Sequence, residues 1–202
     1  RTYVGAGHPR RSQLLFGKPS SMSRVALVLQ GPWSRVWMTN LAELKLTFDE
    51  IIVSTYLTDD LLLFMNDPIS KPIIFVINDD LVPPGFINYR NLWFQAKTTL
   101  NGSRRSTCEF VIKGRLDESY SNICLFRDTV LAYPESISSL NLFFRRVMVT
   151  PFHPSDHLFG AKREWIIDAM ERILTWLWCW PETVYATENE IMGPEVIIGQ
   201  SL

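Results

Sequence analysis

The chain has 202 residues, of which 47% are hydrophobic and 20% are charged, and its formal net charge is −1. This composition is typical of a globular protein and excludes a largely disordered one. The near-zero charge, with no basic stripe along the chain, argues against a nucleic-acid partner. Three cysteines without a CxxC pair offer neither a zinc pattern nor a disulfide framework, which fits a reducing compartment.

The first half of the chain alternates apolar runs with helical patterns after an irregular segment, residues 1–23. Short continuous apolar runs predict strands buried on both faces, as in a parallel sheet, at 24–30, 51–55, 73–77 and 109–112. Helical spacing of apolar residues predicts helices over 37–48 and 88–100. Asn101 and Gly102 are expected to end the second helix, because both residues favour helix C-termini.

The second half has a less regular pattern. Residues 147–150 and 158–161 are expected to be short strands, and 162–178 a Trp-rich helix for which core packing is favoured over a membrane surface. The order of elements predicts an α/β fold, with a Rossmann-type, mostly parallel sheet flanked by helices. One domain is expected to span residues 24–202.

Polar residues follow each apolar run of the first half. In open α/β sheets, ligands bind beyond the carboxyl ends of the strands, so these residues are candidates for a binding site. The four groups are Gln30-Gly31-Pro32, Ser54-Thr55, Asn78-Asp79-Asp80 and Arg115-Leu116-Asp117.

Asp117 is the strongest single candidate among them. A carboxylate just past a buried strand can hold Mg²⁺ or Mn²⁺, which neutralises the diphosphate of a nucleotide sugar. Asp79 and Asp80 follow the same logic. The alternative is that these residues only shape turns, with Arg115 paired to Glu118.

Two further groups of polar residues have both a functional and a structural interpretation. Asn88, Asn91 and Gln95 share one face of the predicted helix, which is either a ligand-facing stripe or a solvated surface. The segment 151–157 contains His153, Asp156 and His157 within five residues. It fits metal binding through a histidine, a general base at Asp156, or a helix cap and turn without chemistry.

Taken together, these segments resemble the ordered motifs of the WavE-like lipopolysaccharide synthesis family, over roughly residues 24–165. The likeness is carried by Ala26–Pro32, Glu50–Thr55, Asn78-Asp79-Asp80, Asn91, Gln95, Thr99, Gly102, Phe110–Asp117 and Pro151–Lys162. The resemblance implies a glycosyltransferase of surface-polysaccharide assembly with a GT-A-like fold.

The resemblance also implies roles for individual residues. Gln30, Gly31 and Pro32 would border the base and ribose of the donor, and Arg90, Asn91 and Gln95 would face its diphosphate or sugar. Asp117 would stand for the DXD motif of such enzymes, whose first acidic position is here Arg115, a residue that can itself neutralise phosphate. Further donor contacts are expected at Thr55, Asp79, Asp80, Lys113 and Arg115. His153 and His157 are the expected partners of Asp117 around Mn²⁺ or Mg²⁺, and the catalytic base is Asp156, with Glu190 and Glu195 behind it.

The expected function is transfer of a sugar from a nucleotide-sugar donor to a hydroxyl of a glycan or lipid-linked saccharide. The alternatives are a non-catalytic nucleotide-sugar or glycan-binding domain of the same fold, and an unrelated nucleotide-binding α/β enzyme. No apolar run approaches the roughly 18 residues of a membrane span. The expected location is therefore cytoplasmic, with a peripheral contact at the inner face of a membrane left open.

Overall fold

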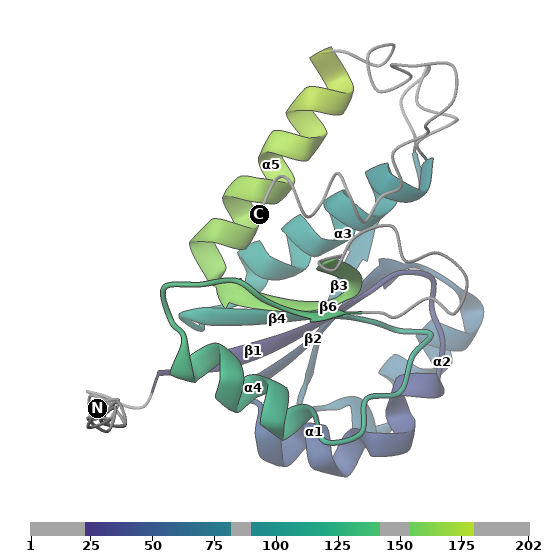
Figure 1. Ribbon diagram of the computed structural model, residues 1–202. Coiled ribbons are helices and arrows are strands. Elements are labelled where there is room, and N and C mark those ends of the chain that lie inside the picture. The colour runs from purple at the N-terminus through teal and green to yellow at the C-terminus, as the bar shows by residue number, and fades with distance from the viewer. Residues whose placement is uncertain (1–22, 82–89, 142–153, 180–202) are drawn as a thin grey trace, which may run out of the picture.

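A six-stranded sheet forms the centre of the computed structural model, which describes residues 23–81, 90–141 and 154–179 (Figure 1). The strands lie in the order β3-β2-β1-β4-β6-β5. Their bounds are β1 Val25–Gln30, β2 Glu50–Tyr56, β3 Ile73–Asn78, β4 Phe110–Arg115, β5 Ser138–Asn141 and β6 Pro154–Lys162. The predicted α/β class is confirmed, and so are the four apolar strands of the first half.

The sheet is mixed but mostly parallel. Strand β1 pairs in parallel with β2 on one side and with β4 on the other, and β3 continues the parallel part beside β2. Strand β6 runs antiparallel to β4, and β5 runs antiparallel to β6. The carboxyl ends of β1, β2, β3 and β4 therefore meet at one edge of the sheet, which is called the carboxyl edge below.

Helices cover both faces of the sheet. In Figure 1, α3 and α5 lie together on one face, and α1, α2 and α4 lie on the other. Within the described ranges, the bounds are α1 Leu41–Thr47, α2 Asp59–Met65, α3 Arg90–Arg105, α4 Ile123–Ala132 and α5 Arg163–Cys179, with short 3₁₀ helices at Val36–Asn40 and Pro68–Ser70. None of these helices is both long and apolar enough to cross a membrane.

Strand β1 shows why the parallel strands read as unbroken apolar runs. All six of its residues are buried, since helices cover both of its faces. Ala26 and Val28 pack into the cluster under α3 and α5, whereas Leu27 and Leu29 pack into the opposite cluster. Each aliphatic side chain of leucine or valine size buried in this way contributes roughly 1.5–3 kcal/mol.

Helix α3 extends past the end that the sequence predicted. It continues through Asn101 and Gly102 to Arg105, so the predicted stop at these two residues is wrong. A Cβ atom on Gly102 would lie 2.5 Å from Val28 Cγ1 and 3.1 Å from Ser54 Cβ. The glycine is therefore required by the close approach of α3 to β1 and β2, rather than by a helix terminus.

The segment between β2 and β3 contains a helix, α2, where the sequence predicted only a loop. Thr58 caps it, its hydroxyl accepting a hydrogen bond of 3.2 Å from Leu61 N. Asp59 and Asp60 occupy its first turn, where negative charge interacts favourably with the helix dipole. This combination of cap and acidic first turn was a readable signal.

Two other predictions are modified, and a third is confirmed. The helix predicted over 37–48 is a 3₁₀ turn followed by α1. The strand predicted at 158–161 is part of the nine-residue β6, which begins at Pro154, a position where a strand tolerates proline. The 162–178 helix is confirmed as α5, and its packing on α3 and the sheet makes it a core helix. The strand expected at 147–150 and the segment 1–22 lie outside the described residues.

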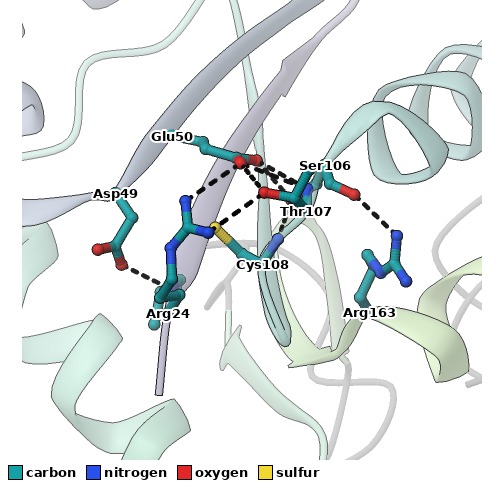
Figure 2. A network of polar contacts seen from close by, with 8 residues as sticks. Arg24, Asp49, Glu50, Ser106, Thr107, Cys108 and Arg163 are labelled. Carbon is teal, nitrogen blue, oxygen red and sulfur yellow. Dashed lines mark hydrogen bonds and ion pairs between the residues drawn. The ribbon is translucent and has the colours of Figure 1, made fainter. Parts of the chain in front are cut away.

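A polar network joins the amino ends of β1, β2 and β4, opposite the carboxyl edge (Figure 2). Glu50 is its centre: its carboxylate accepts hydrogen bonds from Ser106 Oγ (2.8 Å), from Thr107 N (3.0 Å) and from the Thr107 hydroxyl. Arg24 Nη2 lies 3.4 Å from the same carboxylate. Arg163 Nη1 donates to Ser106 O at 2.7 Å. This network ties the end of α3 and the start of α5 to the sheet.

Candidate binding site at the carboxyl edge

The carboxyl edge contains a switch point, at which the order of strand addition changes from one side of β1 to the other. From β1 the chain builds β2 and β3 outward on one side, and it then returns to place β4 on the other side of β1. Open α/β sheets bind ligands at such a switch point. Here the ends of β1 and β4 are joined by a hydrogen bond of 3.0 Å from Leu116 N to Gln30 O. The switch point therefore brings together two of the predicted groups, Gln30-Gly31-Pro32 and Arg115-Leu116-Asp117.

Gly31 makes the turn that leaves β1. Its φ of +117° is in the region that favours glycine, and a Cβ atom placed there would meet no other atom within 4 Å. Thr55 Oγ1, at the end of β2, donates a 2.7 Å hydrogen bond to Gly31 O. Further along this loop, Arg35 forms two hydrogen bonds with Asp60, of 3.0 and 2.5 Å, at the start of α2. The turn thus leaves an open backbone surface and is fixed on both sides.

Helix α3 starts beyond the carboxyl edge, contacts the strand ends through Thr98 and Asn101 in its second half, and ends at the amino edge. Its later residues approach the amino-edge network through Ser106, whereas Thr98 Oγ1 lies 3.0 Å from Gln30 Oε1 and donates to it. Lys97 pairs with Asp79 just past β3. The amino end of α3 therefore lies on the same side of the sheet as the predicted ligand groups, about two helical turns beyond the strand ends.

A buried amide chain continues from α3 to β3. Asn101 Nδ2 donates to Asn78 Oδ1 at 2.7 Å, and Asn78 Nδ2 donates to Ser54 Oγ at 3.1 Å. Asn78 is 7% exposed and Ser54 is fully buried. These side chains hold α3 against the strand ends. Because Asn78 and Ser54 are buried, they support the candidate site and do not form its surface.

The side-chain oxygen of Gln95 is buried without a hydrogen-bond partner among the described residues. A buried amide oxygen without a partner costs roughly 1–3 kcal/mol, so a hydrogen bond to this atom would stabilise the protein. Asn91, one turn earlier, is exposed. The side chain of Arg90, the first residue of α3, lies outside the described residues.

Arg115 and Asp117 form a bidentate pair at the end of β4. Arg115 Nε donates to Asp117 Oδ1 at 2.8 Å, and Arg115 Nη2 donates to Oδ2 at 2.7 Å. The hydrogen bonds from Arg115 hold the pKa of the Asp117 carboxyl below its usual value, against the opposing effect of burial. Arg115 Nε also lies 3.7 Å from Glu118 Oε1, so the pairing with Glu118 that was considered as an alternative also occurs.

Tyr120 connects this ion pair to the start of β6. Its hydroxyl accepts a 2.7 Å hydrogen bond from Arg115 N, donates to Glu118 Oε2 at 2.8 Å and lies 3.2 Å from His157 O. Burial raises the pKa of the phenol, so Tyr120 keeps its proton at neutral pH. The His157 ring in turn contacts the Glu118 carboxylate through Nδ1. His157 and Asp117, predicted as partners, are thus linked through Glu118 and Arg115.

The remaining predicted residues have different environments. Lys113 is fully buried, with its ammonium 5.4 Å from the centre of the Phe159 ring, so its side chain is not exposed at the carboxyl edge. Pro32, Asp79 and Asp80 are exposed. Asp156 belongs to β6, but its side chain is outside the described residues, as are His153, Glu190 and Glu195 entirely.

The described residues alone do not fit Mn²⁺ or Mg²⁺. Within the described ranges, no group of three or more histidine, cysteine, aspartate or glutamate side chains is arranged to hold a metal ion. The carboxylates near the switch point already have partners, since Arg115 binds Asp117 and both Tyr120 and His157 contact Glu118. A metal site at Asp117 would need His153 or another residue beyond those described, and metal dependence stays a prediction.

The sequence did not predict the residues that position the site through buried hydrogen bonds. Tyr120 and Thr98 carried no motif, because a hydroxyl that becomes buried between distant strands has no local signature. Asn78 was among the predicted polar groups because it ends an apolar run, but the sequence did not predict that it would hold α3 against the strand ends. Compared with known proteins, the chain matches no family model and no curated protein.

Proposed function

We propose that this protein is a glycosyltransferase whose nucleotide-sugar donor binds at the switch point between β1 and β4. The observation that carries the proposal is the meeting of the open Gly31 turn with the Arg115–Asp117 pair at this one point of the carboxyl edge. A donor of this class needs a backbone that it can approach closely and a cation for its diphosphate. The mostly parallel sheet with helices on both faces agrees with a GT-A-like fold, which is part of the proposal.

In this proposal Arg115 provides the positive charge for the diphosphate. Its side chain is 26% exposed, and two of its guanidinium nitrogens now bind Asp117, which is 48% exposed. Phosphate oxygens match the same planar fork geometry as a carboxylate, so a diphosphate can replace Asp117 as the partner of Arg115. Asp117, released from the pair, would then be available to the sugar or to a cation that accompanies the donor.

Other predicted donor residues would contact the base, the ribose and the sugar of the donor. The Gly31 turn offers open backbone to the base and ribose. Gln95 has a buried amide oxygen without a partner among the described residues, and rotation of its side chain would let this oxygen accept a hydrogen bond from a sugar or ribose hydroxyl.

Transfer requires that the bond between the anomeric carbon and the diphosphate oxygen breaks while an acceptor oxygen bonds to that carbon. Arg115 would stabilise the negative charge that develops on the departing nucleoside diphosphate. If the anomeric configuration inverts, a carboxylate removes the proton of the acceptor hydroxyl. Asp156 at the start of β6 is the proposed base, because β6 pairs with β4 and begins at the carboxyl edge.

Calorimetric titration of the whole chain with diphosphate sugars of uridine, guanosine, thymidine and adenosine tests donor binding, and release of free nucleotide tests catalysis. Arg115→Ala is expected to weaken donor binding by about 10- to 100-fold, the loss of roughly 1.5–3 kcal/mol of charged hydrogen bonding. Arg104→Ala is the matched control, because Arg104 is an exposed, ion-paired arginine at the far end of α3.

The outcomes separate the candidate functions. Binding that depends on Arg115 together with acceptor-dependent nucleotide release supports the transferase. Binding without any release in the presence of glycan acceptors indicates the non-catalytic binding domain, for which the loss of an acidic residue at position 115 is the supporting observation. Absence of binding to all four donor classes, or equal binding by the Arg115 and Arg104 variants, overturns the proposed site.

A further inference from the structure

A pocket of about 460 Å³ lies on the side of the sheet away from the switch point. Its residues come from the link between α4 and β5 and from the first turns of α5: Glu135, Ser136, Ile137, Trp165, Asp168 and Arg172. Lys162, just before α5, pairs with Phe110, the first residue of β4, so α5 begins at the amino edge. The volume falls in the range of about 300–1,000 Å³ that small-molecule sites occupy. The pocket is therefore separate from the proposed donor site.

The charges around the pocket are paired with one another. Glu135 Oε1 accepts from Lys162 Nζ at 2.6 Å, and Asp168 Oδ2 accepts from Arg172 Nη2 at 2.7 Å. Neither sign of charge is in excess, so an ionic ligand would have to displace one of these partners. An uncharged ligand would not. The pairing thus favours a neutral ligand.

Each carboxylate keeps one oxygen for such a ligand. Among the described residues, Glu135 Oε2 and Asp168 Oδ1 have no hydrogen-bond donor, and both side chains are mostly exposed. The ion pairs restrain the carboxylates while leaving these oxygens able to accept from hydroxyl groups. A ligand with several hydroxyls meets this pattern better than a purely apolar one.

Trp165 provides the apolar part of the pocket. It is partly buried against the α3 and α5 core, and the Lys162 ammonium lies 5.2 Å from the centre of its ring. An indole wall offers contact area to C–H groups, which carry a small positive charge and suit the electron-rich ring. Ile137 adds a second apolar side chain. The full pattern is an apolar wall, hydroxyl acceptors and no net charge.

From this pattern we infer that the pocket binds an uncharged saccharide unit, held by C–H contact with Trp165 and by hydroxyl hydrogen bonds to Glu135 and Asp168. Such a ring has C–H groups on one side and hydroxyls at its rim, and it needs no counter-charge. The inference goes beyond the proposed function, because it assigns a second, non-catalytic glycan site at the opposite edge of the sheet. It would hold a remote unit of a glycan, independently of donor binding.

Saturation-transfer NMR of the whole chain tests this site. The probes are methyl glycosides of glucose, galactose, mannose and N-acetylglucosamine and their disaccharides, at about 10 mM, where weak binding is still detected. Ser136→Trp fills the pocket from an exposed position and is expected to abolish the signal of the binding saccharides. Trp165→Ala is expected to reduce affinity about tenfold or more, and circular dichroism checks that it folds.

Trp178→Ala is the matched control, because Trp178 is an exposed tryptophan near the end of the same helix. It is expected to leave the signal unchanged. Arg115→Ala should also leave it unchanged, so failure of the donor proposal and failure of this one are distinguishable. The inference is overturned if no neutral glycoside gives a signal that Ser136→Trp removes. Stronger pocket-dependent binding of glucuronate or glucosamine than of glucose overturns it as well.

Discussion

Glu50→Gln is expected to destabilise the fold at neutral pH, although it preserves the shape of the side chain. The carboxylate is 10% exposed and accepts from Ser106, from the Thr107 backbone and from the Thr107 hydroxyl. An amide has only one oxygen. If that oxygen keeps the bonds from Ser106 Oγ and Thr107 N, the NH₂ group faces the Thr107 hydroxyl and the Arg24 guanidinium.

The magnitude follows from what the amide loses. Hydrogen bonds to a charged group contribute roughly 1.5–3 kcal/mol each, and one such bond is replaced by a neutral one or reversed. The contact with Arg24 adds little, about 0–1 kcal/mol, since Arg24 is half exposed. The free energy of unfolding should therefore fall by about 1–3 kcal/mol. For a chain of this length the midpoint temperature should fall by about 2–10 °C.

The pH dependence of the stability difference tests independently whether the Glu50 charge stabilises the fold. Burial raises the pKa of Glu50, but the hydrogen bonds from Thr107 and Ser106 together lower it by more than burial raises it. The folded pKa therefore lies below the ordinary value of 4.5. A depressed folded pKa stabilises the fold above the ordinary value, and this stabilisation is lost as the pH falls through the folded pKa. The difference between the wild type and Glu50→Gln should therefore be full at pH 7 and shrink below about pH 4.5.

Urea denaturation followed by circular dichroism, at a series of pH values, measures this difference. Glu109→Gln is the control, because it removes the same charge one residue before β4 from an exposed side chain that forms no hydrogen bond or ion pair among the described residues. Equal stability of the two variants at pH 7 would refute the importance of the network. A difference that persists unchanged at pH 3 would refute the role of the Glu50 charge.

Three further predictions concern α3 and the switch point. Gly102→Ala should lower the free energy of unfolding by roughly 1–2 kcal/mol in urea titration, because overpacking against the stiff Val28 side chain outweighs the higher helix propensity of alanine; equal or greater stability would contradict the close packing of α3. Asp117→Asn should abolish nucleotide release while the unfolding midpoint changes little, since an exposed surface ion pair is worth about 0–1 kcal/mol; near-normal turnover would make Asp117 only a turn residue. Gln95→Met should leave stability equal or higher, as it removes a buried oxygen without a partner, and should weaken donor binding by about three- to tenfold in calorimetry; unchanged affinity would remove Gln95 from the site.

The parallel half of the sheet was predictable because its signal is local. A strand covered on both faces is apolar over most of its length, and β1 and β2 show this as the runs 25–29 and 51–53. The antiparallel position of β6 beside β4 was not predictable in this way. It depends on pairing between residues about fifty positions apart, such as Val111 with Ala161. The prediction at Gly102 was wrong because glycine occurs both at helix ends and where a helix packs closely on a sheet. The sequence alone does not distinguish these two uses.

The candidate site divides along the same line. Gly31, Arg115 and Asp117 lie at the ends of apolar strands and were identified from that position. Tyr120 was not, because its role comes from burial between β4 and β6, which no local pattern encodes.

The pairing of Arg115 with Asp117 shows why a motif alone does not define the chemistry. In the sequence, an arginine at the first position of the expected acidic motif indicates that one metal-binding carboxylate is missing. In the structure it is a cation held two residues from a carboxylate, at the end of the central strands, with its backbone fixed by Tyr120. Such a pair presents one positive and one negative group at fixed positions, and a bound diphosphate would compete for the positive one. In the proposed site, Arg115 would weaken metal binding and would bind an anion instead, and donor affinity measured with and without chelator distinguishes the two consequences.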